Sequence, residues 1–481
     1  MTEPHFLVRP YTGHCPVMTE AALQSAYRVL QDSIIHYRGE PVGTMAACDP
    51  EGVAAENYQD CFIRDFAVSA MVFLADGEYD IVRNFLVTVL ELHNQRKADC
   101  GHELVSGVMP ASFRVIRDES GRETLHADFG DKAIGRVTPV DSMLWWMLVL
   151  GVYVRISGDH QLAERPEFQQ TIRQILQLML RESFEDFPTL LVPDGSFMID
   201  RRLGVHGHPL EIQVLLFAAL EVGRELLESS KENHALAKLA LQRRRALRSY
   251  LRLFYWLDLE RLNEIHRFNT EEFGDGTVNM LNVYPESIPD WLVDWLPDDA
   301  GYLVGNLGPG RMDFRFFARG NLLAIQFGLV YEEQAQAILN LYASRQDDLV
   351  GSMPAKICYP AMEGDEWKMV TGSDPKNVPW SYHNGGNWPV LLQTLTAAAV
   401  RMGRLDIAQQ AMDQAMKRLP ADQWPEYYDG RKGRLIGRRA NRHQVWSATS
   451  FIMSHKVIEQ PELPGLFTPE SWRPKKQPAK T

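Results

Sequence analysis

The sequence predicts an all-α protein, a single (α/α)6 barrel of six helical hairpins with a short β-hairpin and long loops at one end. Apolar residues recur at i, i+3, i+4 and i+7 in twelve windows, as expected for helices with one buried face. The connections between these windows alternate between short and long, and no Ser- or Gly-rich linker divides the 481 residues. We therefore expect one domain over 1–481, with a core at about 17–458 between two tails. The alternative is a multi-domain helical protein.

The predicted helices share the helical spacing of apolar residues, and their boundaries are approximate. In chain order they are 21–37, 64–74, 79–96, 141–156, 168–181, 209–227, 235–257, 314–327, 332–343, 387–401, 406–416 and 444–455. Short connections at 75–78, 328–331 and 402–405 join neighbouring helices. Long connections at 97–140, 182–208, 258–313 and 344–386 are rich in Gly, Pro, Asp and Trp. Loops of this length in a compact domain are usually functional, so we expect them to surround a pocket at one end of the barrel.

The segment 189–200 has a different pattern. Two short apolar runs, 189–192 and 196–199, flank Pro193-Asp194-Gly195, which is a strong turn signal. The pattern predicts a short β-hairpin that places Asp200 at the end of its second strand.

Composition and charge exclude several classes of protein. The net charge of −12 is opposite in sign to that of a nucleic-acid-binding protein. The longest apolar run, 143–154, is too short to span a membrane, and the N-terminus lacks the features of a signal peptide. The five cysteines are scattered without CxxC spacing, which predicts reduced thiols in a cytoplasmic protein rather than disulfides or a zinc site.

Two distant loops each place a carboxylate among aromatic, Gly and Pro residues. Asp200 follows an apolar run and precedes two arginines, and Glu426 lies between Pro425 and two tyrosines. A pair of carboxylates from separate segments is what glycoside hydrolysis requires. Each residue also has a structural alternative: Asp200 could pair with an arginine or cap the turn, and Glu426 could be a helix N-terminal charge or a solvated loop residue.

Two further segments suggest sugar binding. Arg64 and Asp65 lie side by side at a predicted helix start, where they could bind adjacent hydroxyls, although Asp65 could equally be a first-turn charge. The loop 380–388 combines tryptophans with His and Asn, and flat aromatic faces pack on sugar rings. His206 and His208 lack a third metal ligand at suitable spacing, so we predict no metal site. In the basic run 431–442, a solvated face or subunit contact is expected, with Arg442 as the residue that could turn inward.

Together these segments resemble the neutral/alkaline invertases, cytosolic sucrose hydrolases. The resemblance runs from about 57 to 451, and its most specific stretches are 58–65, 134–146, 194–213, 380–388 and 424–429. It implies an (α/α)6 barrel that cleaves sucrose to glucose and fructose with inversion, without a cofactor or metal. It also implies a homo-oligomer, with a hexamer as the suggested form, and no nucleic-acid or membrane partner.

The same resemblance implies roles for individual residues. It places the general acid at Asp200 and the general base at Glu426. The residues implied to line the sugar pocket are Tyr58, Asp60, Arg64, Asp65, Gln213, Trp380, His383, Asn384 and Arg442.

Three other functions remain open from the sequence. An inverting glucosidase of the same barrel type could act on trehalose or a glucosylglycerate. A sugar isomerase or epimerase could move protons with His383 and a second histidine. A noncatalytic carbohydrate-binding toroid would bind sugar without turnover.

Overall fold

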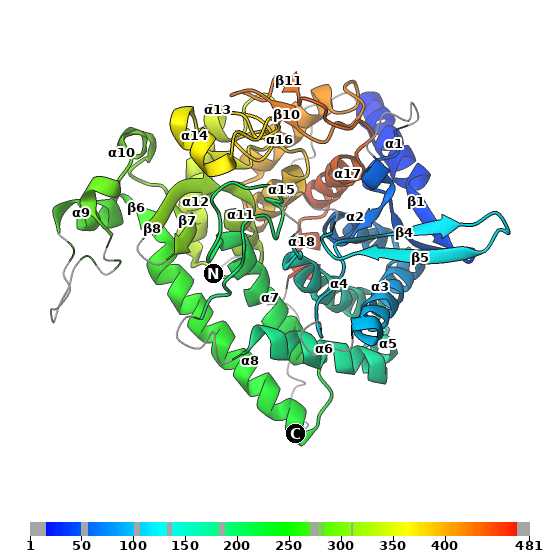
Figure 1. Ribbon diagram of the computed structural model, residues 1–481. Helices are drawn as coiled ribbons and strands as arrows, with labels where there is room; N and C mark the ends of the chain where they lie inside the picture. Colours follow the sequence, from blue (N-terminus) through cyan, green and yellow to red (C-terminus); the bar gives the residue numbers. More distant parts are fainter. Residues whose placement is uncertain are drawn as a thin grey trace, which may run out of the picture.

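The structure of the protein is a computed structural model (Figure 1). It describes residues 16–49, 56–100, 106–131, 137–181, 188–268, 270, 279, 281, 283–308 and 311–468. Helices dominate this part of the chain, and four small antiparallel sheets lie between them. No described helix has the length and apolar character needed to cross a membrane.

Six helices pack against one another in a closed ring. They are α2 (Ile63–Asp76), α4 (Asp141–Ser157), α7 (Leu210–Leu226), α11 (Ala318–Gln326), α15 (Leu391–Arg401) and α17 (Val445–Glu459). Each contacts the next in this order, and α17 packs on α2 to close the ring. Their sequences explain this position: α4 and α7 are apolar on almost every face, and nearly every residue in them is buried. A helix that is apolar all round has to be surrounded by protein.

A second set of helices covers the ring from outside (Figure 1). These helices are α1 (Pro16–Asp32), α3 (Tyr79–Cys100), α6 (Pro166–Met179), α8 (Lys231–Tyr250), α12 (Glu332–Ser344) and α16 (Leu405–Arg418). They are amphipathic: α6 buries Phe168, Ile172 and Ile175 on one side, as the helical spacing predicts. Each of the twelve predicted windows overlaps one of these inner or outer helices.

Short helices and strands fill the connections. The remaining helices are α5 (His160–Glu164), α9 (Leu259–Arg267), α10 (Asp290–Trp295), α13 (Gln346–Leu349), α14 (Gly364–Thr371) and α18 (Leu463–Leu466). The strands are β1 (Ile34–Tyr37), β2 (Glu40–Thr44), β3 (Cys61–Phe62), β4 (Ser112–Arg117), β5 (Glu123–Asp128), β6 (Trp256–Asp258), β7 (Gly301–Gly308), β8 (Arg311–Phe317), β9 (Cys358–Tyr359), β10 (Tyr428–Asp429) and β11 (Leu435–Ile436). The sheets have the orders β1-β2, β3-β4-β5, β6-β7-β8-β9 and β10-β11.

Three helical windows were predicted too long. The window 21–37 ends in β1, and the window 314–327 begins in β8. The window 235–257 ends in a π-helical turn (Leu251–Tyr255) and β6. The apolar residues of β8 are buried as expected, whereas those of β1 are only half-buried, and in each case the segment pairs with a strand. Tertiary pairing decided the local structure there.

The predicted β-hairpin at 189–200 is wrong. Val192 pairs instead with Gly207 in an isolated antiparallel bridge, and residues 196–199 form bends. The carboxylate of Asp194 accepts hydrogen bonds from the backbone N–H groups of Leu203 and Gly204 at 3.0 and 2.7 Å. An Asp side chain that captures backbone donors competes with strand pairing. The segment therefore forms a compact loop that still delivers Asp200 to the interior.

Candidate active site

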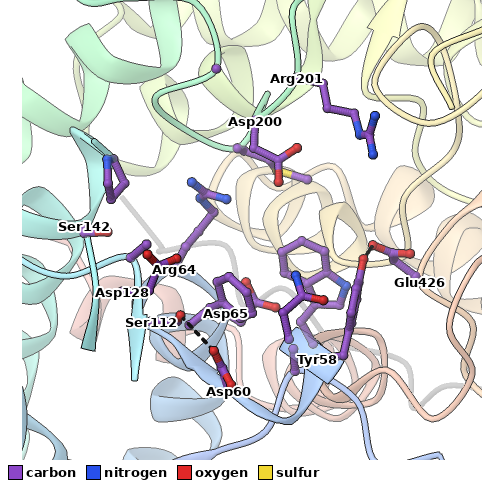
Figure 2. A pocket seen from close by; sticks show the side chains of 18 of the residues that line it. Tyr58, Asp60, Arg64, Asp65, Ser112, Asp128, Ser142, Asp200, Arg201 and Glu426 are labelled. Carbon is purple, nitrogen blue, oxygen red and sulfur yellow. Dashed lines mark hydrogen bonds between the residues drawn. The ribbon is translucent and has the colours of Figure 1, made fainter. Parts of the chain in front are cut away.

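A cavity of about 300 Å³ lies at the N-terminal end of the helix ring (Figure 2). Its lining includes first-turn residues of α2 and α4, namely Arg64, Asp65 and Ser142, and Trp446 from the start of α17. The loops that precede α2, α4, α7, α15 and α17 contribute the rest of the wall. Helix N-termini carry partial positive charge, so this end of the ring stabilises carboxylates and other electron-rich groups.

The lining residues come from separate segments spread along the chain. They are Ala46, Asn57, Tyr58, Asp60, Phe62, Arg64, Asp65, Ala111, Ser112, Asp128, Gly130, Val137, Pro139, Ser142, Gly195, Met198, Asp200, Arg201, Lys376, Tyr382, His383, Trp388, Glu426, Gln444 and Trp446.

Both predicted carboxylates, Asp200 and Glu426, line this cavity. Figure 2 shows them entering from separate loops, with Tyr58 beside Glu426. The Tyr58 hydroxyl donates a 2.6 Å hydrogen bond to Oε1 of Glu426. The other oxygen, Oε2, lies 3.8 Å from Nζ of Lys376 and makes no hydrogen bond within the described part of the chain. One oxygen of Glu426 is thus fixed while the second is free to accept a proton.

Burial raises the pKa of Glu426, and two neighbours oppose this rise. The Lys376 ammonium and the Tyr58 hydrogen bond both stabilise the ionised carboxylate. The side chain is only 3% exposed, so these interactions are weakly screened by water.

Burial also raises the pKa of Asp200, against the opposing charges of Arg64, Arg201 and Lys376. Its side chain nevertheless keeps 45% of its surface accessible, because it faces the cavity. A carboxyl with a raised pKa and an open face can be protonated and donate that proton to a ligand.

Two neighbouring ionisable residues at the start of α2, Arg64 and Asp65, line the cavity. Arg64 at the start of α2 makes a two-point ion pair with Asp141 at the start of α4, at 2.5 and 3.2 Å. Beside it, burial raises the pKa of Asp65 to about 7, an effect that Arg64 opposes and Glu426 reinforces. Asp65 therefore changes charge near neutral pH.

His383 is a neutral member of the wall. Its Nδ1 lies 3.5 Å from Oδ1 of Asp200, and its ring stacks on Trp388 with centroids 5.0 Å apart. Burial lowers the pKa of His383 well below its usual value, and the positive charges of Lys376, Arg201 and Arg64 lower it further. A neutral imidazole can donate and accept hydrogen bonds but carries no charge at neutral pH.

Five predicted sugar-pocket residues line the cavity: Tyr58, Asp60, Arg64, Asp65 and His383. The carboxylate of Asp60 also accepts hydrogen bonds within the protein, from Ser112 at 3.3 Å and from Arg114 at 2.6 Å. Asp60 therefore holds β4 against the start of α2 as well as facing the cavity.

Gln213 and Asn384 lie outside the cavity lining, contrary to the prediction. Both are fully buried amides that hold backbone in place. The Gln213 amide bonds both the N–H and the C=O of Leu190, at 2.8 and 2.9 Å. The Asn384 amide makes the same two-point contact with Met362, at 2.7 and 3.0 Å. Their hydrogen-bonding capacity is used within the protein rather than for a ligand.

Trp380 and Arg442 also lie outside the lining. The Trp380 indole donates a 2.5 Å hydrogen bond to Glu363, and Arg431 stacks over its ring. Arg442 does not turn inward: its guanidinium donates to Gln423 at 3.1 Å near the surface.

Lys376 was not predicted from the sequence, yet it contacts Glu426 and lies 4.1 Å from the Tyr382 ring centroid. A single lysine in a loop is usually solvated, and only its position four residues before Trp380 could have suggested otherwise. Gln444 and Trp446, which follow Arg442 closely in the sequence, were not predicted as site residues either, yet both line the cavity. Within the described residues, no group of three or more His, Cys, Asp or Glu side chains could hold a metal.

Several solved structures that share this fold have glycosidase names. A wild-type glycosidase superimposes with a TM-score of 0.54 at 14% identity, covering 93% of this chain and 99% of that one. The GH63 mannosylglycerate hydrolase from Thermus thermophilus in complex with glucose gives a TM-score of 0.52 at 11% identity, covering 90% and 99%. At these identities the similarity establishes the fold alone.

Sequence relatives are much closer. The chain is 48% identical over 467 residues to alkaline/neutral invertase C, mitochondrial, of Arabidopsis thaliana, covering 96% of this chain and 70% of that protein. It is 46% identical over 476 residues to probable alkaline/neutral invertase F of the same plant, covering 99% and 94%. Cytosolic invertase 1 of Oryza sativa subsp. japonica is 48% identical over 446 residues, covering 92% and 79%. A family model described as alkaline and neutral invertase matches residues 26–461, so the protein belongs to the alkaline and neutral invertase family of glycoside hydrolases.

Proposed function

We propose that this enzyme hydrolyses sucrose at the glucosyl C1–O bond with inversion, using Asp200 as general acid and Glu426 as general base. The main support for the proposal is the hydrogen bonding of the Glu426 carboxylate, which lines the same cavity as Asp200. One carboxylate oxygen is fixed by Tyr58, and the other makes no hydrogen bond with any described residue. That second oxygen is suited to accept a proton from an attacking water.

In the proposed reaction, water attacks the glucosyl C1 from the side of Glu426. The carboxylate takes one proton from this water as the new C–O bond forms. Asp200 gives its proton to the glycosidic oxygen as the bond to fructose breaks. One water molecule is consumed, and the two carboxyl groups exchange their protonation states, which solvent then restores.

The environments of the two carboxyls support this division of roles. Tyr58 and Lys376 stabilise the ionised form of Glu426, as a base requires. Asp200 has an open face toward the cavity and a pKa raised by burial, as an acid requires. In an inverting enzyme the two groups are roughly 6.5–9.5 Å apart, which leaves room for the water.

The ring of six inner helices and its outer layer support an (α/α)6 barrel in a single domain. For location, Cys48, Cys61 and Cys358 are free thiols, which favours a reducing compartment such as the cytoplasm. The relatives carry cytosolic, mitochondrial and chloroplastic names, so their names do not decide the compartment. A homo-oligomer is proposed from the family resemblance and is tested by light scattering of the purified chain.

Sucrose hydrolysis monitored by NMR tests substrate and stereochemistry together. We expect β-glucose as the first-formed anomer, because attack opposite the α-linked fructosyl group inverts C1. Asp200→Asn and Glu426→Gln should each reduce kcat by about 1,000-fold or more while the protein stays folded.

Three outcomes would reject the proposal. Near-full activity in either folded variant would remove the assigned acid or base. First-formed α-glucose would indicate retention. Turnover of trehalose or a glucosylglycerate in preference to sucrose, or sugar interconversion without hydrolysis, would favour one of the other functions considered from the sequence.

A further inference from the structure

A buried lysine joins three loop segments behind the cavity. Lys356 is 1% exposed, and its ammonium donates to Oδ1 of Asn387 at 2.9 Å, the carbonyl of Arg431 at 2.9 Å and the carbonyl of Gly385 at 3.3 Å. An ammonium has three N–H donors, and all three are used. No carboxylate of a described residue lies within ion-pair distance of this ammonium. The lysine therefore serves three neutral oxygens rather than an acid.

The backbone around Lys356 shows that these segments lie side by side. Lys356 and Asn387 form an antiparallel bridge, and Asn387 forms another with Tyr428. Asn387 and Tyr428 exchange two backbone hydrogen bonds, at 3.0 and 2.8 Å. The Asn387 amide also donates to the carbonyls of Val350 and Met353, at 3.0 and 2.6 Å. Asn387 therefore lies between Lys356 and Tyr428. The Lys356 ammonium links the Asn387 side chain to the carbonyl of Arg431, in the segment that contains Tyr428.

These segments carry two parts of the proposed active site. The segment that contains Gly385 and Asn387 also contains His383 and Trp388, which line the cavity. Glu426 precedes the bridged Tyr428 by two residues and the Arg431 carbonyl by five. A displacement of this segment would therefore move Glu426 relative to His383 and Trp388.

We infer that Lys356 is a positioning residue for Glu426, which holds the Glu426 segment against the segment that carries His383 and Trp388. This inference rests on the proposed role of Glu426 as base. Without the ammonium, the carbonyls of Gly385 and Arg431 and the amide oxygen of Asn387 would lose buried hydrogen bonds. Buried oxygens without donors are costly, so the segments would shift to find other donors. Catalysis is sensitive to displacements of this kind, since misplacing a reacting group by about 1 Å can cost about 100-fold in rate.

The charge state of Lys356 supports its role as a three-way donor. Burial, with a smaller contribution from Arg431, lowers the pKa of Lys356 to about 8, although Cys358 and Asp348 oppose the decrease. The protonated form has a donor for each of the three oxygens. The neutral amine has only two N–H groups and a lone pair that would face the third oxygen.

Lys356→Met, measured with sucrose in the parent enzyme and in the Glu426→Gln background, tests the inference. The matched control is Lys432→Met, because Lys432 neighbours Arg431 but is 58% exposed and pairs with Asp347 at the surface. In the parent enzyme we expect Lys356→Met to lower kcat by about tenfold or more with KM changed by less than about threefold. In the Glu426→Gln background it should cost less than about twofold, because the positioned group has already lost its function. The control should stay within about twofold in both backgrounds.

Thermal unfolding is followed for every variant, so that loss of folded protein is separated from loss of rate. If Lys356→Met does not fold, Lys356→Gln, which retains amide donors, replaces it in the same cycle. A folded variant that keeps kcat within about twofold of the parent overturns the inference, and so does an equal fold-loss in both backgrounds. Failure of the proposed function is distinct from either result, since Glu426→Gln alone would then retain its activity.

Discussion

The surroundings of Glu426 fix the position of its carboxylate and influence its pKa. Its N–H donates to the Asn441 carbonyl at 2.9 Å, and Tyr58 holds one of its side-chain oxygens. Lys376 supplies a positive charge 3.8 Å from the other oxygen, and this interaction opposes the effect of burial on the pKa. The same lysine lowers the pKa of Asp200. One lysine thus affects both proposed catalytic groups in the same direction.

Lys376→Met should move the pH profile of kcat/KM to higher pH. Without the ammonium, the pKa of Glu426 rises, so the base becomes ionised only at higher pH and the acid limb moves upward. The pKa of Asp200 rises as well, so the alkaline limb, which reports the general acid, moves in the same direction. Rates are measured across pH for this variant and for Lys368→Met, whose side chain is 59% exposed and pairs with Asp365 on α14. An acid limb at the parent position in Lys376→Met would contradict this account.

The residue pattern and the family resemblance together located part of the site. Tyr58, Arg64, Asp65, His383, Asp200 and Glu426 were predicted and all line the cavity. Gln213 and Asn384 were predicted on the same grounds, yet they bond buried backbone. An amide that binds a sugar and an amide that holds a loop have the same chemistry, so only the three-dimensional structure distinguishes the two roles. Lys376 escaped notice because its partner Glu426 is 50 residues away in sequence.

At the scale of elements, loop segments are held by side chains as much as by strands. The loop that delivers Asp200 depends on Asp194 and on the Gln213 amide, which bonds Leu190. Gln213 lies in the first turn of α7, so the loop is fixed to a ring helix. The predicted hairpin would have delivered Asp200 through strand pairing. The turn at 193–195 was predicted correctly. The local sequence pattern does not reveal that side-chain hydrogen bonds to the backbone compete with strand pairing in this segment.

Gln213→Leu should destabilise the protein without weakening substrate binding. The substitution leaves a buried N–H and a buried C=O of Leu190 without partners, which should lower the free energy of unfolding by about 2–4 kcal/mol. KM for sucrose should change by less than about twofold, since Gln213 does not line the cavity. Urea unfolding and steady-state kinetics check the two expectations, with Gln177→Leu on the exposed side of α6 as control. A large rise in KM with unchanged stability would restore Gln213 as a sugar contact.

Helix periodicity predicted the elements well because each ring helix is long and buries many apolar side chains. The twelve windows each overlap a helix, and most boundaries agree within a few residues. Some strands were missed because they are very short and pair with distant segments, as β3 does with β4 across 50 residues. Others, such as β4 and β5, form local hairpins inside connections that the sequence analysis treated as long loops. Pairing between distant segments depends on where the ring places the loops.

At the scale of the whole molecule, the ring gathers ionisable groups at one buried end. Burial raises the pKa of Asp65 and of Glu211 to about 7, well above the values of these groups in an unfolded chain. Arg319 lies 3.5 Å from Glu211 and opposes the rise in that residue. The folded state therefore retains protons on these carboxyls at pH values where the unfolded chain has released them.

This difference predicts how stability depends on pH. A raised pKa in the folded state contributes stability that is fully present below about pH 4 and is lost as the pH rises through about 7. The Asp65→Asn, Glu211→Gln double variant should therefore show a smaller loss, or a larger gain, of unfolding free energy between pH 5 and pH 8 than the parent. Urea titrations at each pH measure this difference, and contributions from other groups such as His383 cancel in the comparison. A parent and variant with parallel pH dependence would refute the assignment.

The closure of the ring by α17 packing on α2 also constrains how the enzyme folds during translation. Gln444 and Trp446 lie in the last segment of the ring to leave the ribosome, and they complete a wall in which Tyr58 and Arg64 were synthesised hundreds of residues earlier. Until they arrive, the growing polypeptide exposes the apolar flanks of α2 and α15, which α17 later covers. A nascent chain therefore lacks a complete cavity wall and exposes apolar surface until α17 is in place.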